Sequence, residues 1–173
     1  MAKSKADRVL LAALAVLFLG FIFVIHDLFE QRIIDAGDKA PEFSLTTEAG
    51  RRITQSDFGG KLLVLNFWAT WCPPCIEEMP SLNQFAQEME PAGVVVLSVS
   101  IDKNETAYKR FLQQQKLSFQ VARDANADIP TQYGTFRWPE TYIIDRSGKV
   151  VIKHIGPRNW MDPAIVREVR AQL

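Results

Sequence analysis

The chain contains two cysteines, Cys72 and Cys75, which are separated by two prolines, Pro73 and Pro74. A short apolar run at 62–68, rich in Leu, Val and aromatic residues, comes shortly before them and predicts a buried strand. A proline directly after Cys72 is typical of the first position of a helix. Both sulfurs should therefore lie where a strand is followed by a helix, whose unpaired amides and dipole favour a thiolate over a thiol. The spacing suits a disulfide across one helical turn and predicts thiol-disulfide chemistry.

Two other interpretations of the cysteine pair are half of a zinc site and a pair of inert, buried cysteines. A zinc site needs four ligands, and the chain adds only His26 and His154 to the two thiols, which argues against zinc. We expect His154 to be an exposed strand residue. Inert cysteines fit less well with the strand-to-helix position that redox chemistry requires.

Composition predicts a globular protein and excludes one large class of partner. The 173 residues leave room for one ordinary domain and an appendage, and 47% of them are hydrophobic. Lys and Arg total 20 and Asp and Glu total 20, so the chain has no net positive charge that would attract nucleic acid. We expect no nucleic-acid partner and no cofactor.

The N-terminal region has the pattern of a membrane anchor. Every residue in 9–25 is uncharged and nearly all are apolar, and Leu28 and Phe29 extend the run. About 20 such residues form a helix of about 30 Å, which matches the core of a bilayer. We predict an uncleaved transmembrane signal anchor at 9–29. A cleaved signal peptide is the alternative, but the run does not end in the small residues of a cleavage site.

Charge on either side of this run predicts its orientation. The basic residues precede it, within 1–8, whereas Asp27, Glu30 and Asp35 follow it. Lys and Arg residues that flank a membrane span usually stay on the cytoplasmic side. Residues 1–8 should therefore be a cytoplasmic tail, and the chain after the span should face the periplasm or the outer side of the cytoplasmic membrane. Disulfide chemistry persists in that compartment.

The remaining chain alternates strand and helix patterns after a linker at 30–39. Periodicity and turn residues predict an α/β domain at 40–173, a three-layer sandwich with a mixed central sheet. The predicted ranges are strands at 43–46, 51–54, 62–68, 93–101, 119–121, 140–145 and 149–155, and helices at 73–89, 104–115, 129–133 and from 162 onward.

Four segments give the domain a specific likeness: Ala-Pro-Glu-Phe-Ser-Leu at 40–45, Asn-Phe-Trp-Ala-Thr-Trp-Cys-Pro-Pro-Cys at 66–75, Glu-Met-Pro at 78–80 and Trp-Pro-Glu-Thr-Tyr-Ile-Ile-Asp at 138–145. With these segments the domain resembles the thioredoxin-fold, membrane-anchored TlpA/ResA/DsbE-like family of thiol-disulfide oxidoreductases. The resemblance implies a helix and strand inserted at 104–121. It also implies reduction of disulfides in client proteins such as apocytochrome c or copper-site assembly proteins.

The same resemblance assigns roles to residues near the disulfide. It implies that Cys72 attacks and Cys75 resolves, and that Glu78 is a functional acid. We accordingly expect Cys72 to be the exposed sulfur at the helix end and Cys75 to face inward one turn further on. The alternative for Glu78 is an ordinary first-turn glutamate favoured by the helix dipole. Asn66 stands where cytoplasmic thioredoxins carry a buried Asp, which strengthens the case for Glu78 as the source of acid-base help.

A loop far along the sequence should face the cysteines. The resemblance implies that Pro139 is the cis-proline of the fold, whose neighbouring backbone pairs with an extended client chain. Trp138 departs from the small or β-branched residue common at that position, and it either narrows the range of clients or packs on Trp71. Glu140 is similar to the Pro-Glu-Thr of DsbE-like cytochrome maturation proteins. The predicted client-binding residues are Trp71, Pro73, Pro74, Trp138, Pro139 and Glu140.

Together these observations predict a tethered extracytoplasmic reductase that serves cytochrome c maturation and receives electrons from a membrane-embedded thiol donor. One alternative is a Cu(I) metallochaperone module, because two thiolates suit this soft ion. A proline facing the cysteines offers no side-chain ligand and argues against it. The other alternative is a disulfide oxidase or isomerase, because active sites of this type span about −270 to −120 mV.

Overall fold

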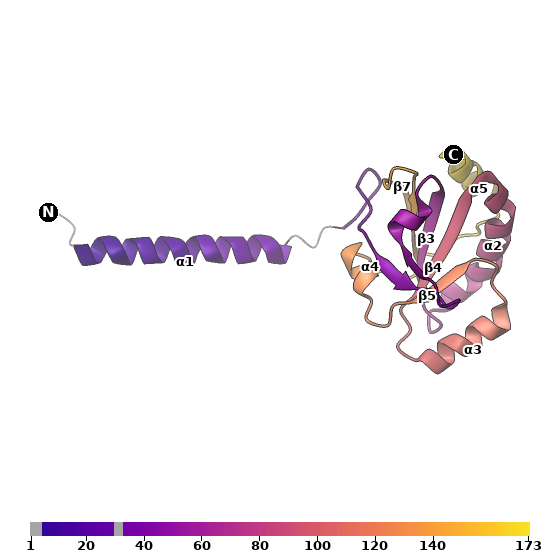
Figure 1. Cartoon of the computed structure of the whole chain (residues 1–173), viewed down its shortest axis with the longest axis horizontal. Helices are drawn as coiled ribbons and strands as arrows, with labels where there is room; N and C mark the ends of the chain where they lie inside the picture. The colour runs from indigo at the N-terminus through magenta and orange to yellow at the C-terminus, as the bar shows by residue number, and fades with distance from the viewer. Residues whose placement is uncertain (1–4, 30–32) are drawn as a thin grey trace. The chain divides into compact units, whose positions relative to one another are not determined.

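The computed structural model of the chain describes residues 5–29 and 33–173 (Figure 1). Helix α1 belongs to one compact unit and the domain from Ile33 to Leu173 forms another. The predicted tail at 1–8 and linker at 30–39 lie partly outside the described residues. The elements are α1 Lys5–Phe29, β1 Ser44–Thr46, β2 Arg52–Thr54, η1 Gln55–Phe58, β3 Leu62–Trp68, α2 Pro73–Met89, η2 Glu90–Ala92, β4 Val94–Ser100, α3 Glu105–Gln115, β5 Gln120–Arg123, α4 Asp128–Gln132, β6 Glu140–Ile144, β7 Val150–Ile155 and α5 Pro163–Arg170.

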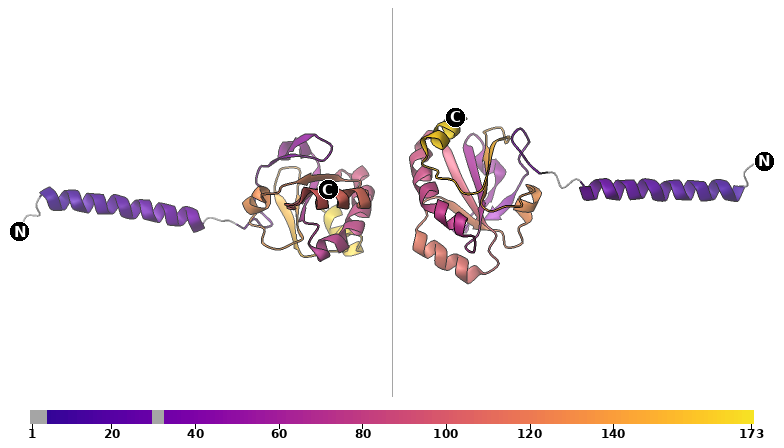
Figure 2. Two further views of the ribbon diagram at one scale, coloured as in Figure 1. Left: turned by 90° about the horizontal axis from the view of Figure 1, so that it is seen from below. Right: turned by 180° about the vertical axis from the view of Figure 1, so that it is seen from behind.

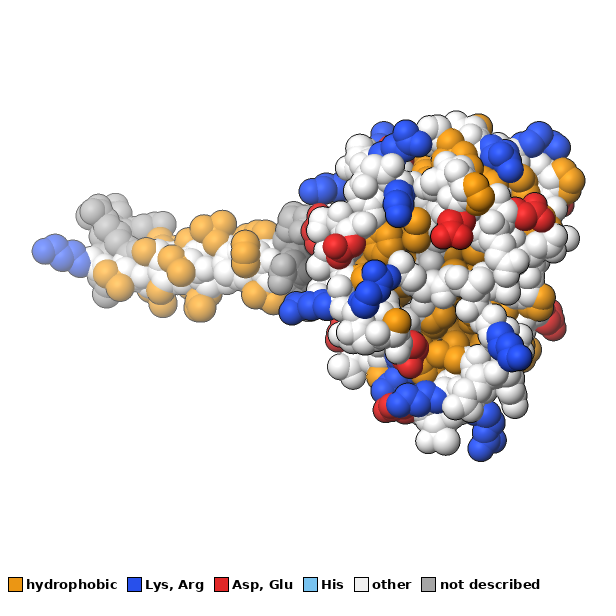
Figure 3. Space-filling view, turned by 45° about the vertical axis from the view of Figure 1, so that its right-hand side comes forward, with side chains coloured by type: hydrophobic (Ala, Val, Ile, Leu, Met, Phe, Trp, Pro, Cys, Tyr) orange, Lys and Arg blue, Asp and Glu red, His pale blue; other side chains and the backbone are white. Residues whose placement is uncertain are grey.

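Helix α1 exposes its apolar side chains, among them Val9, Leu17 and Phe23. Figure 3 shows such side chains along the helix, whereas charged side chains of both signs are interspersed over the visible face of the domain. Across residues 5–29 and 33–173, no helix meets the combined length and apolarity that a membrane crossing requires.

A five-stranded mixed sheet is the centre of the domain at 33–173, in the order β5-β4-β3-β6-β7. Strands β3, β4 and β5 run parallel to one another, while β6 is antiparallel to both β3 and β7. All seven residues of β3 are buried, as expected for a strand covered on both faces. The predicted α/β sandwich with a mixed sheet is confirmed.

Each face of the sheet has its own hydrophobic core. Alternate β3 residues, such as Val64 and Trp68, pack with α2, α3 and α5 on one face. Their neighbours Leu65 and Phe67 pack with α4 and the β1–β2 hairpin on the other. Figures 1 and 2 show α2 and α5 on the side of the sheet opposite α4.

Helix α2 begins directly after Cys72, the N-cap residue, and Pro73 occupies its first turn. It buries Met79, Leu82 and Phe85 against the sheet. Its observed range, Pro73–Met89, matches the prediction. The insertion predicted at 104–121 appears as α3 followed by β5, which pairs in parallel with the outer side of β4.

Candidate active site

Cys72 and Cys75 form a disulfide with their Cα atoms 5.3 Å apart. The short turn after β3 carries Cys72 to the N-terminus of α2, and the peptide N–H groups of Cys75 and Ile76 both donate to the Cys72 carbonyl. The cysteines therefore lie at the strand-to-helix junction predicted for them.

The two cysteines differ little in exposure. Cys72 is 5% exposed and Cys75 is 0% exposed. The expectation of a well-exposed attacking sulfur needs correction, because Cys72 packs into the same hydrophobic core as Trp68 and Met79. The exposed surface beside it belongs to Trp71, which is 60% exposed, and to Pro73.

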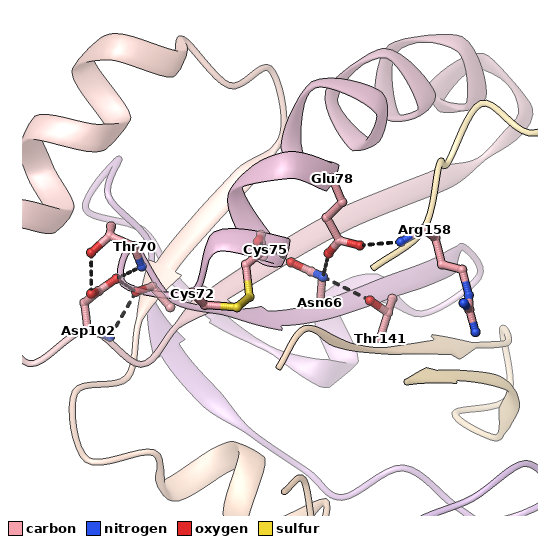
Figure 4. The surroundings of a disulfide bond; sticks show 10 residues. Asn66, Thr70, Cys72, Cys75, Glu78, Asp102, Thr141 and Arg158 are labelled. Carbon is pink, nitrogen blue, oxygen red and sulfur yellow. Dashed lines mark hydrogen bonds between the residues drawn. A yellow bond between two sulfur atoms is a disulfide. The ribbon is translucent and has the colours of Figure 1, made fainter. Parts of the chain in front are cut away.

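A buried carboxylate that the sequence did not single out fixes the turn before Cys72. Asp102 accepts hydrogen bonds from the backbone N–H of Thr70 at 2.9 Å and from its hydroxyl at 2.6 Å. The hydroxyl of Ser100 donates to the same carboxylate at 2.6 Å. Figure 4 shows Thr70 and Asp102 on one side of the disulfide and Glu78 on the other.

Glu78, one helical turn after Cys75, has an interior carboxylate and is 3% exposed. Its Oε1 accepts from Asn66 Nδ2 at 2.9 Å. Its Oε2 accepts from the backbone N–H of Arg158 at 3.1 Å (Figure 4). The same oxygen accepts from Trp160 Nε1 at 3.4 Å. Its position is thus unlike that of an ordinary solvated first-turn glutamate.

Asn66 connects Glu78 to the sheet. Its Nδ2 also donates to Thr141 Oγ1 at 3.0 Å, and its Oδ1 accepts from the Ser98 hydroxyl at 2.8 Å. Strand pairing places these residues side by side, because Asn66 of β3 pairs with both Ser98 of β4 and Thr141 of β6. Three neighbouring strands thus each contribute a neutral polar group.

Burial raises the pKa of Glu78 to about 7, because the carboxylate loses its hydration. The hydrogen bond from the Arg158 backbone opposes this shift, followed by those from the side chains of Asn66 and Trp160. A carboxyl group with such a pKa can gain and lose a proton near neutrality, which an acid-base group requires.

The loop at Pro139 meets the same end of the sheet. The Trp138–Pro139 peptide bond is cis. Pro139 is buried and precedes Glu140, which pairs with Phe67 near the end of β3 that leads to the cysteines. Trp138 is half-buried and packs against both hydrophobic cores.

Glu140 was expected to bind clients, but the structure places its side chain inside the domain, 0% exposed. Its Oε1 lies 3.0 Å from Lys153 Nζ and accepts a hydrogen bond from the Tyr142 hydroxyl. Pairing of β6 with both β3 and β7 turns this carboxylate into the core, so it is unavailable to a client in this state.

His154 also differs from what the sequence indicated, and Trp160, which the sequence did not single out, lies beside it. The His154 side chain is 12% exposed, and its ring packs edge-on against Trp160 with centroids 5.9 Å apart. Trp160 itself is fully buried and reaches Glu78. The expectation of an exposed histidine was wrong, because α5 and the loop before it cover this part of β7.

The model of the AhpC/TSA family matches residues 36–153. The chain belongs to this family. Thiol-disulfide oxidoreductase ResA of Bacillus thuringiensis subsp. konkukian is 34% identical over 151 residues, which cover 85% of this chain and 87% of the relative. Thioredoxin-like protein YneN of Bacillus subtilis is 37% identical over 125 residues, 71% of this chain and 73% of that protein.

Solved structures place this AhpC/TSA protein among the same enzymes. A structure from Chlorobium tepidum, described as thiol:disulfide interchange protein DsbE, is 36% identical, with a TM-score of 0.71 over 80% of this chain and 95% of its own. A second thiol:disulfide interchange protein from Chlorobium tepidum is 27% identical, with a TM-score of 0.67 over 78% and 97%. The protein is a thiol-disulfide oxidoreductase of the ResA and DsbE type, as its sequence predicted.

Proposed function

We propose that this oxidoreductase is a membrane-tethered extracytoplasmic reductase, and that its clients include apocytochrome c during cytochrome c maturation. The observation that carries this proposal is the cysteine pair at the start of α2 with a buried acid, Glu78, one turn further on. The DsbE-like segment at 138–145 supports the choice of client, and the likeness to a DsbE structure agrees with it.

The proposed reaction transfers two electrons to the client. The Cys72 thiolate bonds to one client sulfur and displaces the other as a thiolate, which takes a proton from solvent. Cys75 then loses its proton, and its sulfur attacks that of Cys72. The disulfide of the enzyme closes and the second client sulfur leaves. A membrane-embedded dithiol donor returns two electrons and restores both thiols.

Glu78 is proposed to accept the proton of Cys75 in the resolving step. Its helical spacing from Cys75 places both side chains on one face of α2. Its raised pKa suits the transfer, because a carboxylate with the ordinary pKa would hold that proton too weakly at neutral pH.

The proposed client surface is smaller than the one expected from the sequence. Trp71 and Pro73 are exposed and Pro74 is half-buried beside the disulfide. Trp138 and the cis-Pro139 peptide lie on the loop leading into β6, where an extended client would pair with the backbone. The Glu140 side chain is left out of this surface because it is buried.

The tether is the part of the proposal that concerns α1. The uncharged run at 9–25 and the exposed apolar side chains between Val9 and Val24 support an anchor at 9–29. The basic residues before it support a cytoplasmic tail at 1–8, with a linker at 30–39 and the oxidoreductase domain at 40–173 outside.

Trapping of the client tests the function directly. In Cys75→Ala the mixed disulfide with Cys72 has no resolving thiol, so client complexes should accumulate and dissolve on reduction. Cys72→Ala is the matched control and should accumulate none. If cytochrome c is served, the trapped partners include an apocytochrome or a heme-ligation component, and cells without the enzyme lack holocytochrome c.

Three results would contradict this proposal. A Cu(I) carrier predicts that both substitutions abolish function equally and that no covalent partner forms. An oxidase predicts that reduced clients, rather than oxidised ones, accumulate in cells lacking the protein. Failure of Cys75→Ala to trap a partner, in cells that need the protein, would refute the reductase.

A further inference from the structure

Within the described residues, the Glu78 carboxylate accepts every hydrogen bond that it makes. Among the described residues, its carboxylate partners are Asn66 Nδ2, the Arg158 backbone N–H and Trp160 Nε1, and each of them donates. This arrangement satisfies an ionised carboxylate. A protonated carboxyl group also carries a donor, so one of its oxygens needs an acceptor that the present arrangement does not offer.

The Oε2 side cannot supply that acceptor. A peptide N–H and an indole N–H can only donate. The loop that holds them is fixed to α2, because the Ser81 hydroxyl donates to the Glu78 carbonyl at 2.9 Å and accepts from the Trp160 backbone N–H at 3.1 Å. Oε2 therefore stays an acceptor in both protonation states.

The Oε1 side can reverse. The oxygen and nitrogen of an amide are nearly equal in size, so a half-turn of the Asn66 amide exchanges them with little movement. Oδ1 would then accept from a protonated Glu78 Oε1 and from the Thr141 hydroxyl, while Nδ2 would donate to Ser98 Oγ. Both hydroxyls can rotate from one role to the other, so the amide again makes three hydrogen bonds. Its second N–H then no longer has one of these groups as an acceptor.

We propose that Asn66, with Ser98 and Thr141, forms a reversible hydrogen-bond switch that allows Glu78 to take up a proton on Oε1 and release it while buried. The inference rests on the proposed role of Glu78 and assigns its proton to one oxygen. One proton leaves the Cys75 thiol and bonds to Oε1, and the Asn66 amide turns. Asn66 is a positioning residue, since it acts through Glu78.

Charged groups near Glu78 shift the pH at which Glu78 takes up its proton, but they do not supply the acceptor that the Asn66 amide provides. The exposed Arg158 guanidinium lowers the pKa of Glu78, and Glu77 is exposed on the same helix. His154 packs against the far side of Trp160. The Nε2 atom of His154 lies 3.4 Å from Oε2 of Glu168 on α5. The groups that the central strands turn toward Glu78 are neutral: Asn66, Ser98 and Thr141.

Nuclear magnetic resonance of the oxidised full chain in detergent micelles tests the switch without a client. The resonance of the Glu78 carboxyl carbon is identified by its absence from the spectrum of Glu78→Gln. Its chemical shift should change with pH at the same midpoint as the resonances of the Asn66 side-chain amide. Above the midpoint the Asn66 NH₂ protons should show contacts to Thr141, and below it to Ser98. Contacts to Thr141 throughout, while Glu78 titrates, would overturn the proposal.

Substitution at Thr141 adds a matched pair of variants. Thr141→Val removes the acceptor of one Asn66 N–H in the ionised state, whereas the protonated state loses only a second donor to Oδ1. The proton affinity of Glu78 should therefore rise about three- to tenfold. Thr141→Ser keeps the hydroxyl and should leave the affinity unchanged. Equal effects of both variants would refute the switch, whereas failed client trapping would refute only the proposed reductase.

Discussion

Glu78 and Glu140 are both buried carboxylates near the disulfide, but they lie on opposite faces of the sheet and meet different partners. Glu140 pairs with the buried ammonium of Lys153, which also donates to the Ile34 carbonyl at 2.9 Å. Within residues 5–29 and 33–173, the donors to the oxygens of Glu78 are all neutral. Burial is nearly equal at 0% and 3%, so burial alone does not distinguish their roles.

The difference shows how one domain can hold one buried carboxylate in an ion pair and surround another with neutral hydrogen-bond donors. The ion pair of Glu140 is hard to break, because removing one partner would leave the other charge unpaired in the core. Neutral amide and hydroxyl groups stabilise the anion less and can change roles. We therefore expect Glu140 to serve the structure of the strand after cis-Pro139 and Glu78 to serve the chemistry.

The largest expected effect comes from breaking the fixed pair. Lys153→Met removes the cation and leaves the Glu140 carboxylate buried and unpaired, so the free energy of unfolding should fall by about 3–5 kcal/mol. Urea unfolding of the oxidised protein measures it. The double variant Lys153→Met/Glu140→Gln should regain most of the loss.

A matched control uses an exposed pair. Lys109 and Glu105 of α3 lie 2.6 Å apart with side chains 56% and 51% exposed. Such a pair contributes little, so Lys109→Met should change stability by less than about 1 kcal/mol. Equal losses in the two lysine variants would show that Glu140 is not held by its partner as we describe.

The second effect depends on pH and concerns Glu78. Its folded pKa of about 7 lies above the ordinary value of 4.5, so the folded state binds the proton more tightly. The stabilisation is complete below the unfolded pKa and is lost as pH rises through the folded one, by up to about 3 kcal/mol. Unfolding of the parent and of Glu78→Gln from pH 4 to 8 should show the parent losing stability relative to the variant. A constant difference would contradict this assignment.

The smallest effect concerns one donor to Glu78. Trp160→Phe keeps an aromatic ring beside Phe85 but removes the indole N–H, which serves the ionised carboxylate. The pKa of Glu78 should rise by about half a unit to one unit, followed by carbon resonance. Trp68→Phe is the matched control, because Trp68 Nε1 has no hydrogen-bond partner within the described part of the chain. A shift of the same size in that control would contradict the role of Trp160.

Local sequence patterns predicted most of the fold. The apolar spacing within 73–89 gave the range of α2, and the alternation within 140–145 and 149–155 predicted the β6–β7 hairpin. These signals are local, since they depend on residues a few positions apart. The cis bond before Pro139 followed only from resemblance, because the dipeptide itself rarely adopts it.

The surroundings of Glu78 could not be predicted in this way. Its partners Asn66, Arg158 and Trp160 are 12, 80 and 82 residues away in sequence and meet only after the sheet and α5 assemble. Glu140 shows the opposite error. Its place in a recognised motif marked it as important, but the register of β6 decides which way its side chain faces.

The burial of β3 has a consequence for when the site can open. This strand supplies Asn66, leads to the cysteines and lies between two paired neighbours, so its amides should exchange with solvent only in the global unfolding of the domain. Asn66, Ser98 and Thr141, which lie beside one another on β3, β4 and β6, belong to this central part of the sheet. We therefore expect the enzyme to change oxidation state on a frame that does not open locally, so that the site lasts as long as the domain stays folded.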